Sequence, residues 1–212
     1  NITIDLIYGI PNMTSDRWKR NLQKAFDFKV NHISSYALTV EEKTALASFI
    51  KNKKYPKLDE ELALEHFSIL IEETEKEGFE QYEISNFAKD AYYAVNNTAY
   101  WKQEPYLGIG PSAHSYDGNN RSWNKANNAQ YIRAISEGNL PLEKEQLSLW
   151  ESYNEFVMTG LRTMWGIALK DLENMFSEAL VAYFIKESEP KLKQGILIKE
   201  KGVIKIHPSQ LF

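Results

Sequence analysis

The sequence lacks cysteine altogether among its 212 residues. Disulfide bonds are therefore excluded, and a chain without them fits the reducing cytoplasm, where we expect this protein to be located. Long apolar runs are absent too. No stretch approaches the roughly 20 residues that a membrane-spanning helix requires, so we expect no membrane span.

Basic residues are fewer than acidic ones. The chain has 25 Lys and Arg residues against 29 Asp and Glu residues, a net charge of −4. This balance argues against a partner such as nucleic acid or an anionic membrane surface, which a basic patch would attract. Aromatic residues, in contrast, reach 13% of the chain. Such a content predicts large packing surfaces or a flat ligand.

Conventional catalytic motifs are missing as well. The sequence has no P-loop, no GxSxG, no GxGxxG that opens a helix and no HExxH. The 4 histidines lie far apart without the spacing of metal ligands. We therefore assign no catalytic residue and no metal ligand. His66, on an apolar helix stripe, and His32, at the start of a strand, are expected to be structural, and His207 to lie in a polar tail.

The first 90 residues follow the pattern of an α/β fold. Alternating apolar residues in ITIDLIYG predict a strand, and Thr14 or Ser15 begins a helix. HISSYAL predicts a second strand, helices follow from Glu41 and over residues 59–77, and FEQYEI predicts a third strand. This order implies a parallel sheet, and three strands amount to half of a (β/α) barrel.

The rest of the chain changes character. Residues 86–128 are rich in Gly, Asn, Tyr and Trp and predict a long irregular loop of functional importance. Helices are expected near 128–137 and 145–162. Two further helices, over 169–176 and 178–193, and a hairpin around Lys201 and Gly202 suggest a winged-helix-like module without a basic reading helix. We predict a partial barrel (1–90), an aromatic loop and helical segment over its mouth (91–165), and this module (166–212).

Two residues are singled out by their surroundings. Asp5 is a carboxylate in an otherwise apolar strand, where burial is costly unless the carboxylate accepts hydrogen bonds. It occupies either a solvated outer position or a ligand site, since barrel chemistry lies at the C-terminal ends of strands. His114 lies in the loop that we expect to be functional, where plain packing is the alternative.

Five blocks carry a resemblance to a known family. They are IDLIYGIP (4–11), HISSYALTVE (32–41), YEISNFA (82–88), YLGIGPSAHS (106–115) and GLR (160–162). In this order and spacing they resemble the radical S-adenosylmethionine family of oxygen-independent coproporphyrinogen III oxidase, and in particular its HemW-like heme chaperone branch. The resemblance implies that the chain is the C-terminal part of a protein nearly twice as long. The missing N-terminal half would hold the CxxxCxxC loop of a [4Fe–4S] cluster and a glycine-rich S-adenosylmethionine loop.

The resemblance also implies binding residues for S-adenosylmethionine. The aspartate of the DLIYG block, here Asp5, touches this cofactor in the family. The strand that matches SSYAL lines it, which indicates Tyr36 and Ala37. The residue after the alanine of GPSAHS approaches it in the oxidase branch, which indicates His114.

The chaperone branch carries an HNxxYW motif that is implicated in heme handling. The matching residues here are Asn96, Asn97, Tyr100 and Trp101, so asparagine replaces the opening histidine. An amide is a poor ligand for heme iron, whereas imidazole is a common one. The resemblance therefore implies a heme platform of Asn97, Tyr100 and Trp101 without its usual iron ligand.

Three functions follow as alternatives. In the first, the parent protein binds heme or a porphyrinogen, carries the cluster and S-adenosylmethionine with radical chemistry secondary, and delivers heme to an accepting protein. In the second, it is a dehydrogenase that oxidatively decarboxylates two propionates of coproporphyrinogen III. In the third, the chain is a half-barrel with a structural role only. The NNxxYW, YEISNFA and GPSAHS blocks favour the chaperone, and the isolated chain is not expected to be active.

Overall fold

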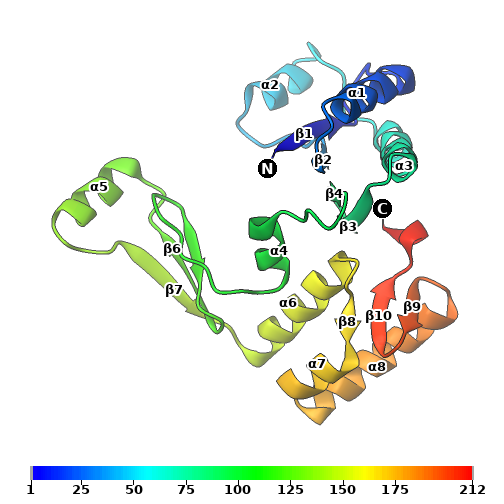
Figure 1. The fold of residues 1–212 in the computed structure, drawn as a ribbon. Helices are drawn as coiled ribbons and strands as arrows, with labels where there is room; N and C mark the ends of the chain where they lie inside the picture. Colours follow the sequence, from blue (N-terminus) through cyan, green and yellow to red (C-terminus); the bar gives the residue numbers. More distant parts are fainter. Residues whose placement is uncertain (1, 212) are drawn as a thin grey trace. The chain divides into compact units, whose positions relative to one another are not determined.

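The computed structural model describes residues 2–211. The chain divides into two compact units, one formed by residues up to Ala94 together with those from Pro208 on, and the other by Val95–His207 (Figure 1). Each unit has its own cluster of buried apolar side chains. Within the described residues, no helix combines the length and the apolar character that crossing a membrane demands.

The first unit alternates strands and helices. Its elements are β1 (Thr3–Tyr8), α1 (Ser15–Asp27), β2 (His32–Ala37), α2 (Ala45–Lys51), α3 (Glu60–Lys76), β3 (Glu80–Glu83), β4 (Asn86–Ala88) and the short 3-10 turn η1 (Pro208–Gln210). Side-chain caps fix where the two long helices begin. Thr14 accepts a hydrogen bond from the backbone of Arg17 before α1, and Asp59 accepts one from Leu62 before α3.

The core of the first unit lies between one face of the sheet and the helices α1 and α3. Trp18 and Leu22 of α1 and Phe67 and Leu70 of α3 are all at most 2% exposed. The sequence expected His66 in this core, and it is fully buried. Its Nδ1 accepts a hydrogen bond from the backbone of Gly9 at 3.2 Å. Helices α1 and α3 therefore cover the face of the sheet that carries the core.

The sheet of this unit differs from the expected parallel one. Its strand order is β1-β2-β4-β3, with β1 at an edge. β1 and β2 are parallel, whereas β4 runs antiparallel to both β2 and β3. A two-residue turn, Ile84 and Ser85, joins β3 to β4. A strand that follows so short a turn returns antiparallel, so β4 takes the place beside β2 that the sequence pattern predicted for β3.

The second unit contains two three-stranded antiparallel sheets. Its first part holds α4 (Val95–Trp101), β5 (His114–Tyr116), β6 (Asn120–Asn124), α5 (Asn128–Ser136) and β7 (Leu142–Gln146). Its second part holds α6 (Leu149–Arg162), β8 (Ile167–Ala168), α7 (Leu169–Met175), α8 (Glu178–Lys193), β9 (Leu197–Glu200) and β10 (Val203–Ile206).

The second part is a helical module with a small β-sheet. Tyr153 of α6, Leu172 of α7, Phe184 of α8 and Ile204 of β10 share one buried cluster. The sheet order is β8-β10-β9, so the hairpin expected around Lys201 and Gly202 is present. Because α6 packs in the same cluster as residues 167–206, we refer to residues 149–206 as the C-terminal module.

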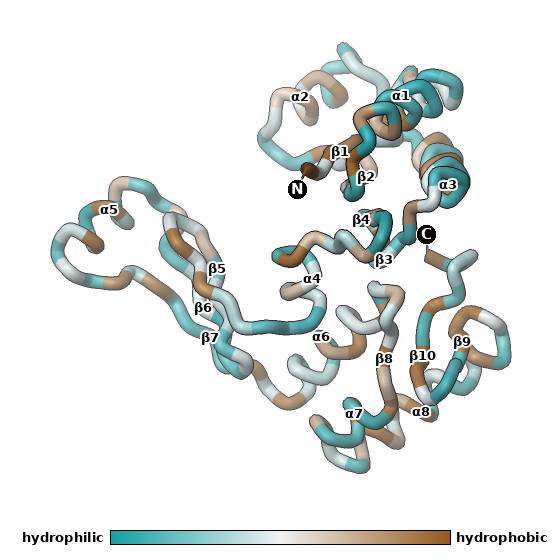
Figure 2. Tube along the Cα trace, in the orientation of Figure 1, coloured by the Kyte–Doolittle hydropathy of each residue, from teal (hydrophilic) through white to brown (hydrophobic). Residues whose placement is uncertain are grey.

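The first part, residues 95–148, overlaps residues 86–128, which were predicted to form a long irregular loop but contain β4, α4, β5 and β6. The helix predicted near 128–137 is present as α5. The helix predicted over 145–162 begins at Leu149, and Leu142–Gln146 form β7, the third strand of the sheet β5-β6-β7. Within the fully described residues 95–148 no apolar side chain is buried. Hydrophobic residues of α5 (brown in Figure 2) are exposed, with Ile132 at 66%. We call residues 95–148 the aromatic segment.

Candidate functional site

Asp5 and Tyr36 lie on the same face of the first unit's sheet. Successive side chains of a strand point to opposite faces. The even-numbered residues of β1 pack against the core, whereas Asp5 is exposed on the other face. The parallel register places Asp5 beside Ser34 and Ile7 beside Tyr36. Among the described residues the Asp5 carboxylate has no hydrogen-bond partner, so it is available to a ligand.

Ala37 takes a different place from the one its grouping with Tyr36 suggests. It packs, partly buried, against the apolar core. Its side chain therefore does not share the face of Asp5 and Tyr36. Only the main chain of Ala37, at the C-terminal end of β2, is left to contact a ligand on that face.

A buried hydrogen-bond network connects the strands β2, β3 and β4 next to Asp5. Glu83 is 2% exposed, and its Oε1 accepts hydrogen bonds from the backbone of Ser85 at 3.0 Å and from the side-chain amide of Asn86. The hydroxyl of Ser34 donates to Oδ1 of Asn86 at 2.8 Å. A buried carboxylate is tolerated when it is bonded in this way. The network fixes the β3–β4 turn to the strand beside Asp5.

His32 forms a second buried link. Its Nδ1 lies 2.7 Å from the hydroxyl of Thr3, and its Nε2 lies 2.8 Å from the hydroxyl of Tyr82. Burial lowers the pKa of His32, although the charges of Asp5 and Glu83 oppose this shift. Burial also raises the pKa of Tyr82 to about 12. Both groups are therefore neutral near pH 7, and His32 is structural, as the sequence predicted.

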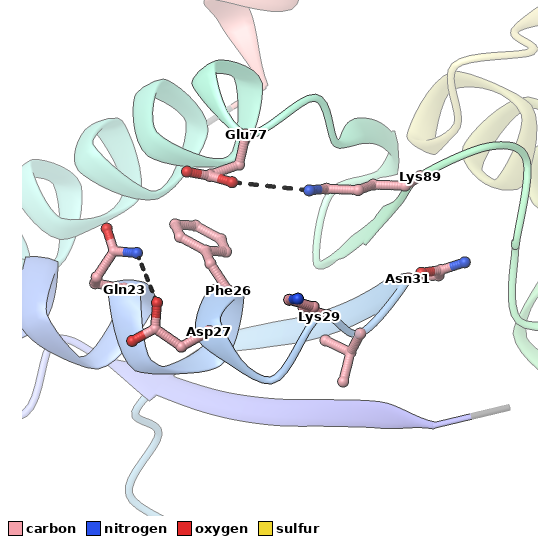
Figure 3. Close-up of a pocket in the computed structure, with 8 residues that line it drawn as sticks. Gln23, Phe26, Asp27, Lys29, Asn31, Glu77 and Lys89 are labelled. Atoms are coloured by element: carbon pink, nitrogen blue, oxygen red, sulfur yellow. Dashed lines mark hydrogen bonds and ion pairs between the residues drawn. The ribbon is translucent and has the colours of Figure 1, made fainter.

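Two hollows lined by described residues of the first unit contain none of the predicted site residues. One, of about 420 Å³, is lined by residues at the end of α1 and by Glu77 and Lys89 (Figure 3). There Lys89 pairs with Glu77 at 3.8 Å and lies over the ring of Phe79 at 4.5 Å. The other, of about 380 Å³, is lined by Ile50, Tyr55, Pro56 and three lysines. Neither hollow brings together groups that point to a reaction.

The aromatic segment carries a continuous row of tyrosines. The rings of Tyr100 and Tyr106 meet edge-on with centroids 4.6 Å apart, and Tyr106 lies 6.3 Å from Tyr116. Tyr106 and Tyr116 are also bridged through their backbones. Burial raises the pKa of both phenols, so they remain protonated near neutral pH. Tyr100 is 50% exposed and leaves the row open to solvent.

The row continues on the same face of the sheet β5-β6-β7. His114 pairs with Trp123, and Trp123 pairs with Glu143, so these three side chains share one face. The rings of His114 and Trp123 lie 6.0 Å apart, and the indole N–H donates to Glu143 at 3.1 Å. Tyr116 lies two residues after His114 and therefore on this face. We call the side chains of Tyr100, Tyr106, His114, Tyr116 and Trp123 the aromatic face.

The loop before β5 is held tightly against it. A Cβ on Gly108 would lie 2.1 Å from the carbonyl oxygen of His114, so only glycine fits this approach. The backbone N–H of Gly108 donates to the hydroxyl of Ser115 at 2.9 Å. The amide of Asn124 donates to the carbonyls of Gly108 and Gly110 at 3.3 and 2.9 Å. The close approach explains Gly108, a φ of +108° explains Gly110, and the hydrogen bonds fix the loop against the backbone of His114.

The residues of the heme-associated motif separate into two groups. Trp101 donates its indole N–H to Asn97 at 3.0 Å, and the guanidinium of Arg162 lies 4.6 Å from its ring centroid. One face of Trp101 is thus covered by a cation. Tyr100, one residue earlier on the same helix, turns instead to Tyr106. The structure therefore joins Asn97 with Trp101, and Tyr100 with the aromatic face.

Several residues of this site were not predicted as such. Trp123, Glu143 and Arg162 had no assigned role, because their partners depend on strand register and on packing against α6. Arg121, the nearest arginine to the aromatic loop in sequence, lies 2.6 Å from Glu155. Arg121 and Trp123 are two residues apart in the sequence RSW. This spacing was the one sequence feature that could have indicated that both side chains lie on one face of a strand.

This chain offers no ligands for an iron–sulfur cluster. It contains no cysteine, and the described residues include no group of three or more His, Asp or Glu side chains arranged to hold a metal ion. Thiolates are the usual ligands of such clusters. The residues of this chain therefore do not fit a [4Fe–4S] cluster.

Comparisons with known proteins agree on one family. Residues 147–209 match the HemN C-terminal domain. The chain is 31% identical over 186 residues to the heme chaperone HemW of Mycobacterium tuberculosis H37Rv, a match that covers 86% of the chain and 48% of that protein. It is 29% identical over 205 residues to heme chaperone HemW of Bacillus subtilis, with 96% and 54% covered. The mouse mitochondrial radical S-adenosyl methionine domain-containing protein 1 is 29% identical over 211 residues, with 93% and 47% covered.

A solved structure shows the same fold. Coproporphyrinogen III oxidase (HemN) from Escherichia coli, a radical SAM enzyme, superposes with a TM-score of 0.76 at 18% sequence identity, over 99% of this chain and 52% of that one. The predicted mixed α/β class and the helical C-terminal module are therefore confirmed. The chain spans about half the length of these relatives. It belongs to the HemW- and HemN-like radical S-adenosylmethionine proteins, and within them it is HemW-like.

Proposed function

We propose that this chain supplies the heme-binding surface of a heme chaperone. The observation that carries the proposal is the aromatic face, which is open to solvent in a segment that has no buried apolar residue. Flat aromatic side chains stack on flat apolar ligands. Two of the relatives named above are named heme chaperones.

An open face suits a protein that must release its cargo. Ligand pockets that retain small molecules bury most of the ligand's surface. Here the described aromatic segment leaves Tyr100 half exposed, and neither hollow of the first unit involves this segment. A tetrapyrrole on this face would keep its second side accessible to an accepting protein. This supports transfer of heme rather than its permanent retention.

Titration with hemin tests the proposal. We expect the chain to bind hemin, and Tyr100→Ala together with Tyr106→Ala to weaken binding by about tenfold or more, because each lost ring removes roughly 0.5–1.5 kcal/mol of stacking beyond its area. The matched control is Tyr92→Ala, a tyrosine of the first unit that is 54% exposed. A chain that does not bind hemin, or equal weakening by the control, would reject the proposed surface.

We also propose that Asp5 contacts S-adenosylmethionine in the whole protein, with Tyr36 on the same face and the main chain of Ala37 beside it. The unpartnered, exposed carboxylate of Asp5 suits a hydroxyl or ammonium donor of that molecule. When bound, the cofactor supplies one-electron chemistry, and these residues orient it. Equilibrium binding of S-adenosylmethionine by Asp5→Asn should be weakened by about 1–3 kcal/mol. Unchanged binding by this variant would contradict the assignment.

A further inference from the structure

We infer that His114 is the axial ligand of the heme iron, in place of the imidazole that position 96 lacks. The inference rests on the proposed heme-binding function. His114 is exposed, and neither ring nitrogen has a hydrogen-bond partner among the described residues. A neutral imidazole with a free nitrogen is the commonest protein ligand of iron in heme. The side-chain amide of Asn96 offers no comparable donor.

The surroundings of His114 are those of a tetrapyrrole site. The family resemblance groups this histidine with the S-adenosylmethionine residues. Within the second unit, however, its neighbours on the sheet face are Trp123 and Tyr116. A porphyrin plane stands perpendicular to its axial imidazole, and the ring of Trp123 is inclined by only 32° to that of His114, so Trp123 would contact the macrocycle with its edge. Ligation and aromatic edge contact would therefore come from one face.

Exposed apolar side chains flank the same position. Leu107 and Ile109 are 79% and 83% exposed. They lie on either side of Gly108, whose backbone presses against that of His114. Two exposed aliphatic side chains thus lie next in sequence to the backbone contact of Gly108 with His114, and apolar side chains of this kind line small-molecule sites. No residue of the aromatic segment buries these two side chains, and a bound ligand would remove them from water.

The backbone of His114 is already fixed before any ligand binds. Ser115 and Asn124 hold the preceding loop through the backbone groups of Gly108 and Gly110. A ligand whose supporting backbone is preorganised loses less conformational entropy on binding. The imidazole therefore needs only to choose its side-chain rotamer when iron arrives.

The charges of the face match ferric heme. The iron(III)–porphyrin centre carries a net positive charge, and Glu143 pairs with Trp123, the register partner of His114. The propionates carry negative charge, and Arg121 lies on the same face opposite Tyr116. Arg121 pairs with Glu155 at 2.6 Å and is 41% exposed, so a propionate can share its guanidinium. Glu143 thus lies in the same row as His114, whereas Arg121 lies one row further along the sheet, beside Glu145.

The test compares absorbance and EPR spectra of hemin bound to the chain and to three variants. We expect the wild type to give the spectrum of imidazole-ligated heme, and His114→Ala to lose it and to bind hemin at least about tenfold more weakly. Added imidazole should restore the spectrum of His114→Ala. The matched control is His207→Ala, which should behave as the wild type, and Asn96→His should tighten binding by adding a second imidazole.

Each result bears on a different statement. If His114→Ala binds hemin with the wild-type spectrum, the ligand assignment is overturned while heme binding stands. If His207→Ala loses the spectrum, the assignment is likewise overturned. If the wild type binds no hemin, the proposed function fails, and the ligand assignment fails with it. Because His114 is exposed, its replacement should leave the circular dichroism spectrum unchanged, which separates loss of ligation from loss of folding.

Discussion

The two parts of the second unit are stabilised in opposite ways. The C-terminal module encloses a cluster of aromatic and aliphatic side chains from three helices and a small sheet. The aromatic segment, residues 95–148, buries no apolar side chain and has one buried polar residue, Asn124. Its order comes from strand pairing and from side chains that bond to the backbone of the loop before β5. The module is thus held by an apolar core, while the segment leaves its apolar groups unburied, as the proposed heme-binding role requires.

The largest effect should come from the core of the module. Phe184→Ala removes a side chain that is 3% exposed within the cluster. We expect it to lower the free energy of unfolding by about 3–5 kcal/mol, the usual cost of truncating a buried phenylalanine. Ile109→Ser, at an 83% exposed position, should change it by less than about 0.5 kcal/mol. Urea denaturation of both variants measures the contrast, and similar losses would contradict it.

A second, smaller effect concerns two glycines that admit no Cβ for different reasons. In Gly108→Ala the new atom meets the carbonyl oxygen of His114 at 2.1 Å, whereas in Gly160→Ala it meets the side chain of Ile167 at 2.6 Å. We expect both to lose about 1–3 kcal/mol of stability through overpacking. Only Gly108→Ala should also weaken hemin binding, because it displaces the aromatic face. Equal hemin binding by the two variants would contradict the separation between residues that support the aromatic face and residues that support only the core of the module.

The smallest effect is a dependence on pH. Burial lowers the pKa of His32 and of His66, both in the first unit. As the pH falls through the ordinary histidine pKa of about 6.5, His32 and His66 become protonated in the unfolded state while they remain neutral in the folded state. The stability of the first unit therefore decreases from pH 7 toward pH 5. Amide hydrogen exchange should show faster opening of α1 and α3, and His66→Gln should reduce this trend. A protection of α1 and α3 that is constant with pH would contradict it.

The sequence predicted the elements that combine a hydrophobic period with a cap. β1 shows an alternating apolar pattern, and Thr14 and Asp59 mark the starts of α1 and α3. β4 was missed because its turn, Ile84 and Ser85, contains neither glycine nor asparagine. The side chain of Glu83 stabilises that turn, and a long-range pairing with β2 completes it. No local pattern reveals either contribution.

The candidate site shows the same limit. The composition of residues 96–116 correctly indicated an aromatic region, and the resemblance singled out Tyr100, Trp101 and His114. Which rings meet depends on register, however. His114 opposes Trp123, and Trp123 opposes Glu143, only because β5, β6 and β7 pair as they do. These strands contain Ser, Asn, Arg and Glu with little apolar alternation, so periodicity gave no sign of them.

The position of β1 at the edge of its sheet has a consequence for handling the protein. β1 pairs with β2 on one side and with no other described strand. Its other side therefore offers a row of backbone donors and acceptors, with Ile7 half exposed beside them. Such an edge is a template for a second strand. Dilute samples and concentrated samples should therefore differ in particle size, and crystallisation or NMR of the chain will depend on a peptide or a sequence change that occupies this edge.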